Sequence, residues 1–222
     1  MTPTSITLRG YAVPFSQTAH IGDGKLERFA PGAFAQMLER PKSIELRWDT
    51  HAEDAPRLAN STSGTLSFFE DSYGLGFVAK LSTRDHWNWS YLRSITQKTK
   101  PMSLVSVGGL VIKSSRRELL QLGTTEVITS ATIDHVTVCN DAAYRGTGCW
   151  PDHLPLDSAP SKIQQLDARW IAGRVAWDRK LATRQKLEAS LRPVGKTVGG
   201  HLVMVAPDGR LFTKRASGGV IW

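Results

Sequence analysis

The chain has 222 residues, of which 41% are hydrophobic and 22% are charged, with 28 Lys and Arg against 20 Asp and Glu. This length accommodates one main hydrophobic core and a small appended unit, and the composition is typical of a globular protein, which excludes wholesale disorder. No apolar run approaches the roughly 20 residues that a membrane-spanning helix needs, and the N-terminus lacks a basic start followed by an apolar stretch, so we expect a protein used in a cytoplasm without membrane contact.

Short strands separated by turn signals are predicted over most of residues 1–150. Runs rich in Val, Ile, Phe and Thr and bounded by Gly, Asp and Ser are typical of strands. They lie at residues 6–15, 43–48, 64–71, 74–81, 102–112 and 126–138. Two helices are predicted between these strands, at residues 33–40 and 85–99. This pattern predicts a mainly β domain, a barrel or a sandwich, with flanking helices over residues 1–150.

The C-terminal part has a different composition. Residues 151–160 are rich in proline and lack periodicity, which predicts a linker. A basic extension follows over residues 161–222: an amphipathic helix at 161–191 and a hairpin at 201–215 around Pro207-Asp208-Gly209. Residues 151–222 hold 12 Lys and Arg against 6 Asp and Glu, a net charge of +6, whereas residues 1–150 hold 16 against 14. The extension therefore suits an acidic partner or nucleic acid, or it simply has a solvated basic face.

Ser106 lies within the apolar run PMSLVSVGGLVI, residues 101–112. A lone serine in a buried strand usually bonds a neighbouring carbonyl, so the position of Ser106 alone does not indicate a nucleophile. Gly108 and Gly109 follow it. Because glycine lacks a Cβ atom, this pair lets a substrate backbone approach closely or opens a bulge, as covalent catalysis on a strand requires. Ser106 is therefore a candidate nucleophile, with Gly108 and Gly109 as candidates for substrate approach.

A serine nucleophile needs a base, and His51 is the leading candidate. It follows the predicted strand at residues 43–48 and precedes a polar loop, so its ring can project from a strand end. Asp134 and His135 are candidates for the group that orients this base. They are adjacent on a predicted strand and point to opposite faces, so only one of them can line a site built on Ser106. The two cysteines form no CxxC pair and have no His at ligand spacing, so no metal is predicted.

The motifs follow one another in a recognisable order. GYAVPF is followed by ERFAPGAF, a strand ending near His51, GLGFVAKL, SVGG and HVTVCNDAAY. This order resembles the prohead serine proteases of tailed bacteriophages, the capsid maturation peptidases that are related to the herpesvirus assemblins. The resemblance covers roughly residues 7–150.

The resemblance implies a serine endopeptidase without a cofactor, on a closed β-barrel wrapped by helices. By position, Ser106 matches the nucleophile of the family and His51 its general base. His135 stands where many relatives carry a glutamate, and it is similar to the third member of the Ser-His-His arrangement in the herpesvirus branch; Asp134 is the alternative third member. By analogy with that branch, Arg145-Gly146 is the candidate oxyanion hole. Gly109 departs from the pattern, because the family has an aromatic residue there.

The resemblance also implies partners and a place of action. The substrates would be scaffold and major capsid proteins of a phage, cut inside an assembling prohead in the host cytoplasm. The herpesvirus relatives need dimerisation for activity, which makes a homodimer one alternative for this chain. The basic extension would target the protease to the prohead or be removed by self-cleavage, for which Ala189-Ser190 and Ala216-Ser217 are candidate sites.

Two other hypotheses compete with the protease. The first is a catalytically inactive barrel of the same descent that acts as a structural or scaffold-like capsid assembly protein; the glycine in place of an aromatic residue and the histidine at the third position favour it. The second is a nucleic-acid-binding module, which the charge of the extension favours. The strands lack clustered basic and aromatic residues, so nucleic acid is not the partner that we expect.

Overall fold

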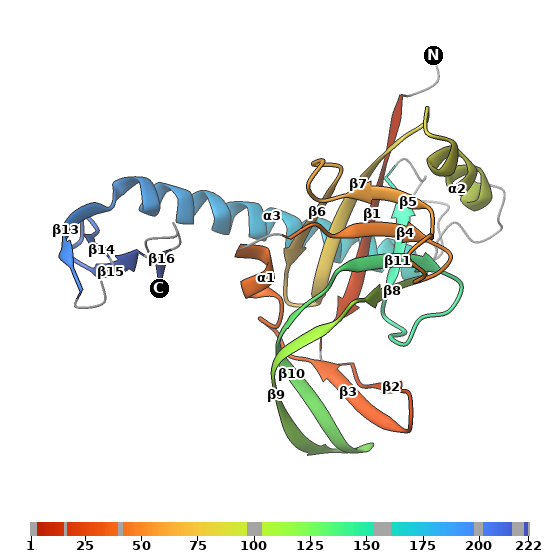
Figure 1. The fold of residues 1–222 in the computed structure, drawn as a ribbon, viewed down its shortest axis with the longest axis horizontal. Helices are drawn as coiled ribbons and strands as arrows, with labels where there is room; N and C mark the ends of the chain where they lie inside the picture. Colours follow the sequence, from red (N-terminus) through yellow and green to blue (C-terminus); the bar gives the residue numbers. More distant parts are fainter. Residues whose placement is uncertain are drawn as a thin grey trace. The chain divides into compact units, whose positions relative to one another are not determined.

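The computed structural model describes residues 4–15, 17–39, 42–96, 104–152, 161–197, 202–214 and 220–221. The predicted linker lies outside the described residues from residue 153 onward. The chain forms two compact units, residues 1–174 and residues 175–222 (Figure 1). None of the helices in the described part of the chain is long and apolar enough to cross a membrane.

The described residues of the first unit form three four-stranded sheets, each named here by one of its strands. The β1 sheet has the order β12 (Gly148–Pro151), β1 (Ser5–Pro14), β7 (Gly74–Ser82), β6 (Leu66–Glu70). The β10 sheet has the order β2 (Ala19–Ile21), β3 (Lys25–Phe29), β10 (Gly123–Thr132), β9 (Val111–Leu120). The β11 sheet has the order β5 (Arg57–Asn60), β4 (Glu45–Trp48), β11 (His135–Cys139), β8 (Leu104–Gly108). Two short helices, α1 (Ala35–Glu39) and α2 (His86–Thr96), complete the elements between the strands.

The mainly β class with helices is confirmed, but the expectation of a closed barrel is wrong, because none of these sheets closes on itself. The edge of the β11 sheet shows one reason. Strand β8 lies beside β1 and β12, yet the Val105 N–H donates to the side-chain hydroxyl of Thr147 at 3.3 Å. The Thr147 side chain thus accepts the hydrogen bond that would go to a backbone carbonyl of the adjacent strand if the sheet continued.

The predicted strands at residues 102–112 and 126–138 are each divided in two. The first contributes β8 and the start of β9, and the second contributes β10 and β11. The two breaks lie opposite each other on the paired strands. Gly109, between β8 and β9, has a φ of 60°. The Asp134 N–H, between β10 and β11, donates to the Gly108 carbonyl at 3.1 Å. The hairpin partners therefore bend together and pass from the β10 sheet to the β11 sheet.

One hydrophobic core lies between the β1 sheet and the β11 sheet. Strands β1 and β7 contribute Leu8 and Phe77, strand β4 contributes Leu46, and strands β8 and β11 contribute Val105 and Val136, all with fully buried side chains. The inward and outward alternation of β8 and β11 follows from this core, because successive side chains of a strand point to opposite faces.

Helix α3 (Ser161–Ser190) packs its first half on the outer face of the β1 sheet. The Trp150 Nε1–H donates to the Asp167 carboxylate at 2.7 Å, and the Trp170 Nε1–H donates to the Phe77 carbonyl at 3.1 Å. The Trp170 ring also stands edge-on to Phe69 with centroids 5.4 Å apart. Both faces of the β1 sheet are thereby covered, which explains why successive residues of β1 from 10 to 14 are all buried.

The second unit contains the rest of α3 and a small antiparallel sheet. Its strands are β13 (Arg192–Lys196), β14 (Leu202–Val205), β15 (Leu211–Lys214) and β16 (Val220–Ile221). The predicted hairpin is confirmed: Gly209 has a φ of 84°, and the Ala206 N–H donates to the Arg210 carbonyl at 2.9 Å. The unit exposes Arg210 in an ion pair with Asp208, 2.7 Å apart.

Replacing Phe77 with Ala tests the core that supports the β11 sheet. The side chain is fully buried, and its removal leaves a cavity, so the free energy of unfolding falls by about 3–5 kcal/mol. Chemical denaturation of the two proteins measures the difference. Leu119→Ala is the matched control, because Leu119 is 84% exposed and its truncation changes the free energy of unfolding by roughly 0.5 kcal/mol or less. Equal losses in the two variants would contradict this placement of the core.

Candidate active site

The face of the β11 sheet that points away from the core carries a band of polar side chains. Val136 and Val138 of β11 point into the core, so His135 and Thr137 occupy the outer face. On β4, Leu46 points inward, which leaves Glu45 and Arg47 on the outer face.

The register of the strands arranges these side chains in two rows across the sheet. One row consists of Asn60, Glu45, His135 and Gly108 on β5, β4, β11 and β8. The other consists of Arg57, Arg47, Thr137 and Ser106 on the same four strands. Directly opposed residues of antiparallel strands have Cβ atoms about 4.5–5.5 Å apart on one face. Ser106 is therefore the cross-strand neighbour of Thr137.

His51 reaches this face from the loop after β4. The Asp49 N–H donates to the Val138 carbonyl at 2.8 Å and extends the pairing of β4 with β11 by one residue. Asp49 then has a φ of 76°, a left-handed conformation that aspartate tolerates better than most residues. The chain turns at this point, and His51 lies over the outer face of β11.

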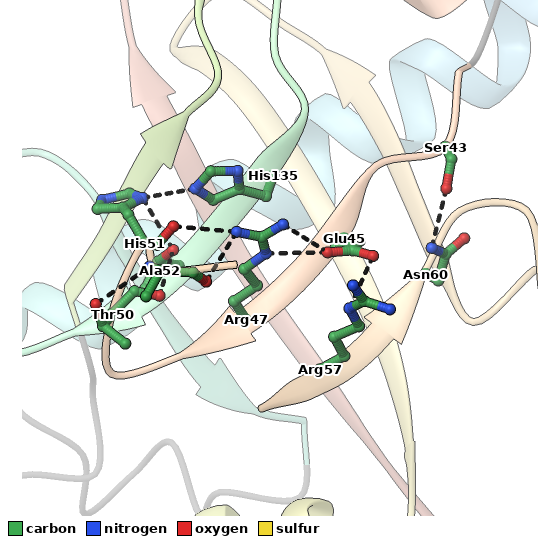
Figure 2. A network of polar contacts seen from close by, with 10 residues as sticks. Ser43, Glu45, Arg47, Thr50, His51, Ala52, Arg57, Asn60 and His135 are labelled. Carbon is green, nitrogen blue, oxygen red and sulfur yellow. Dashed lines mark hydrogen bonds and ion pairs between the residues drawn. The ribbon is translucent and has the colours of Figure 1, made fainter. Parts of the chain in front are cut away.

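The imidazole rings of His51 and His135 are in direct contact (Figure 2). The His51 Nδ1 and His135 Nε2 atoms are 2.8 Å apart, a hydrogen-bond distance. The Thr137 hydroxyl oxygen lies 3.1 Å from the same His51 Nδ1, and this hydroxyl also donates a long bond of 3.5 Å to the Thr50 carbonyl. Two side chains of β11 thus converge on one nitrogen atom of the loop residue His51.

Gly108 is the strand position that makes room for this contact. A Cβ atom on Gly108 would overlap His135 Nε2 and lie 2.6 Å from His51 Nδ1. Gly109 has another role, because its positive φ of 60° turns the chain between β8 and β9 and a Cβ there would lie 2.6 Å from the Asp134 side chain. The imidazole rings, rather than open space, cover Gly108.

Asp134 and His135 occupy different surroundings, as their adjacency on the strand requires. His135 is buried beside His51, with 8% of its surface exposed, whereas Asp134 is exposed and lies beside Gly109. The hydrogen-bond partner of the His51 ring is thus His135, not Asp134.

Arg145 and Gly146 lie in the loop between β11 and β12. Arg145 is exposed, and the Gly146 carbonyl accepts a hydrogen bond from the Tyr73 hydroxyl at 2.9 Å. This loop is tied to β8, because the Thr147 hydroxyl accepts from the N–H of Val105, the residue before Ser106. The structure thus brings His51, His135, Ser106 and Gly108 to one face and fixes the loop of Arg145 and Gly146 to β8.

Desolvation and positive charge both favour neutral imidazoles at this site. Partial burial lowers the pKa of His51 below its ordinary value, and the Arg47 guanidinium lowers it further. Burial likewise lowers the pKa of His135, with Arg47 and His51 adding to the effect and Asp134 and Glu45 opposing it. Both rings are therefore uncharged at neutral pH. In the described part of the chain no group of three or more His, Cys, Asp or Glu is arranged to hold a metal ion.

Two polar residues of the site, Arg47 and Thr137, were not among the predicted site residues. Strand alternation places both side chains on the outer face once the neighbouring core residue is known, because Arg47 comes after Leu46 and Thr137 comes after Val136. Alternation shows which face of the sheet a side chain occupies but not which strand lies beside it. The sequence alone therefore did not indicate Arg47 and Thr137 as site residues.

The sequence of residues 2–149 matches the Caudovirus prohead serine protease family over about two thirds of the chain. The chain belongs to this family. The matched region ends before α3, so the basic extension lies outside it. No curated protein matches the chain. The predicted resemblance is confirmed, and membership implies a prohead serine protease of tailed phages that acts in capsid maturation.

Replacing Gly108 with Ala tests the packing of the imidazole pair in this prohead protease family member. The added methyl group occupies the space of the His51 and His135 rings, so the rings separate and their hydrogen bond is lost. Proton NMR checks this, since the downfield imidazole N–H signal of the hydrogen-bonded pair disappears. Gly195→Ala is the control, because a Cβ atom on Gly195 has no neighbour within 4 Å. An unchanged imidazole signal in Gly108→Ala would contradict the arrangement.

Proposed function

We propose that the chain is a serine endopeptidase with Ser106 as nucleophile, His51 as general base and His135 as the residue that orients the base. The hydrogen bond between His51 Nδ1 and His135 Nε2 carries this proposal. In a catalytic triad the third member bonds Nδ1 of the base, which leaves Nε2 for the serine. Ser106 stands on the same face of the sheet as this pair, one strand away from Thr137.

Thr137 favours the tautomer of His51 that a general base requires, with the proton on Nδ1. Its hydroxyl hydrogen is used toward the Thr50 carbonyl, so its oxygen accepts from His51 Nδ1. His51 then carries its proton on Nδ1 and donates to Thr137 and to His135 Nε2. In this form His51 Nε2 has a free lone pair that can accept the serine proton.

The chemistry follows from these positions. Ser106 attacks the scissile carbonyl while His51 Nε2 takes the hydroxyl proton, and the resulting imidazolium returns this proton to the leaving amine. Water then hydrolyses the acyl-enzyme by the same route. A neutral His135 stabilises the imidazolium less than a carboxylate would, so we infer a slow enzyme. For the tetrahedral oxyanion we propose donors from the loop of Arg145 and Gly146, which is tied to the nucleophile strand through Thr147.

Cys139 is a second nucleophilic side chain on the outer face of β11, two positions beyond Thr137. Its thiol donates a hydrogen bond to the Asp141 carbonyl at 2.7 Å. Burial raises the pKa of the Cys139 thiol above its ordinary value. A protonated thiol that is engaged with a carbonyl is a poor nucleophile, which favours Ser106 as the attacking group.

The substrates that we propose are the scaffold and major capsid proteins of the phage, cleaved inside the assembling prohead in the host cytoplasm. Residues 1–150 would form the protease domain, and the basic extension at residues 161–222 would direct it to acidic surfaces of the assembling shell. Self-cleavage within the extension remains part of the proposal. Of its two candidate sites, Ala189-Ser190 lies at the end of α3, whereas Ala216-Ser217 is outside the described residues.

Replacing Ser106 with Ala tests the nucleophile. Cleavage of co-expressed scaffold and capsid proteins of the same phage falls by at least about 10⁴-fold, because no other group forms the acyl-enzyme. Mass spectrometry of the substrates, and of the purified protease before and after incubation, measures cleavage and any shortened terminus. Undiminished cleavage by Ser106→Ala refutes the assignment. Absence of cleavage with the unaltered chain would favour the inactive capsid assembly protein.

Alanine variants of His135 and Asp134 test which of the two residues is the third member of the triad. The His135→Ala variant loses the acceptor of His51 Nδ1, so its kcat falls by about 10- to 10³-fold. The Asp134→Ala variant keeps the imidazole pair, and its kcat stays within about threefold of the unaltered protein. Steady-state kinetics on a peptide from the scaffold cleavage site measures both. A larger loss in Asp134→Ala than in His135→Ala would reverse the assignment.

A further inference from the structure

Arg47 connects the imidazole pair to the rest of the outer face of the β11 sheet (Figure 2). Its Nη1 atom donates to the carbonyl oxygens of His51 and Ala52, both at 3.0 Å. These are the carbonyls of the loop segment that carries the proposed base. One guanidinium therefore holds two consecutive peptide groups of this loop in place.

Glu45 and Arg57 fix the orientation of Arg47. Glu45 accepts from the Nε and Nη2 atoms of Arg47 with one carboxylate oxygen, each at 2.9 Å, and its other oxygen pairs with Arg57 at 3.0 Å. The Arg47 and Glu45 side chains are only 12% and 15% exposed. A bidentate arginine in such a partly desolvated setting is held more rigidly than a lysine would be.

Arg47 is also a positive charge close to both imidazoles. The charged groups that act on His135 are Arg47, His51, Asp134 and Glu45, and the one that acts on His51 is Arg47. Glu45 and Asp134 raise the pKa of His135, while Arg47 and His51 lower it. A proton on either ring would place a second positive charge beside the guanidinium, which costs free energy.

We propose that Arg47 is a positioning residue for the protease reaction: it anchors the loop that carries His51 and opposes protonation of the imidazole pair. The inference rests on the proposed function for its consequence in catalysis. If either imidazole gained a proton, His51 Nε2 would lose its free lone pair or the ring would lose its orienting partner. The protease is thereby kept competent below the pH at which a free imidazole gains its proton, and the acidic limb of the pH profile reports this effect.

Arg47→Gln removes the charge. Glu45 keeps Arg57 as its partner in this variant, so no carboxylate is left unpaired on the face. The pKa values of His51 and His135 rise, because a repulsive charge is gone and Glu45 is less compensated. The acidic limb of kcat/KM against pH then moves to higher pH, and the ratio of kcat/KM at pH 5.5 to that at pH 8 falls by about three- to tenfold.

Arg47→Lys keeps the charge but loses the bidentate geometry. Its histidines titrate as in the unaltered protein, whereas kcat/KM at pH 8 falls by about tenfold because the loop is less well positioned. Arg116→Gln is the matched control, since Arg116 of β9 pairs with Glu118 and Glu118 keeps Arg28 as its second partner; the pH profile and plateau of this variant stay unchanged.

Histidine titration by NMR, performed in the Ser106→Ala background, separates this inference from the proposed function because it requires no proteolysis. Unchanged histidine pKa values in Arg47→Gln would overturn the electrostatic role, and full activity of Arg47→Lys at pH 8 would overturn the anchoring role. If Arg47→Gln does not fold, Arg47→Met and Arg47→Lys decide the two roles by the same measurements. If the histidines titrate as expected and the unaltered chain cleaves nothing, the protease assignment fails while the electrostatic role of Arg47 stands.

Discussion

The contact between His51 and His135 depends on a strand position without a side chain. At Gly108 the backbone of β8 runs beneath the two rings, and any Cβ atom there would occupy their space. The register between β8 and β11 sets Gly108 opposite His135 and Ser106 opposite Thr137. A shift of one residue would turn Ser106 into the core and a valine to the outer face. Core packing of Val105 and Val136 therefore also fixes the geometry of the candidate site.

The outer face of the β11 sheet combines hydrogen bonds and charge in one small network. Arg47 is held by Glu45, and it in turn holds the loop of His51. Its positive charge lies near two imidazoles that are both partly desolvated, and both the charge and the desolvation disfavour a proton on the rings. Keeping the third residue unprotonated matters more in a Ser-His-His site than in a site with a carboxylate. A protonated third histidine could no longer accept a hydrogen bond from Nδ1 of the base.

Most individual elements could be predicted from the sequence, but their assembly could not. The strands at residues 6–15 and 74–81 have strong apolar patterns and appear as β1 and β7. The long runs that contain Ser106 and His135 were each expected as one strand and are two, because Gly109 and Asp134 interrupt both partners at one level. The expectation of a closed barrel was wrong for a related reason. The side-chain hydroxyl of Thr147 accepts a hydrogen bond from the Val105 N–H on β8, and no local sequence pattern predicts this contact. Such a contact joins residues far apart in the chain.

The sequence by itself determined the family, the strand alternation and the candidates Ser106, His51, His135 and Asp134, since these depend on local patterns and on the order of motifs. Only the tertiary structure decided that His135, and not Asp134, bonds the ring of His51, and that Arg47 and Thr137 join them. The reason is physical: alternation separates the two faces of a strand, but it does not say which face meets a loop from elsewhere in the chain. That choice comes from the register of four strands and from the turn at Asp49.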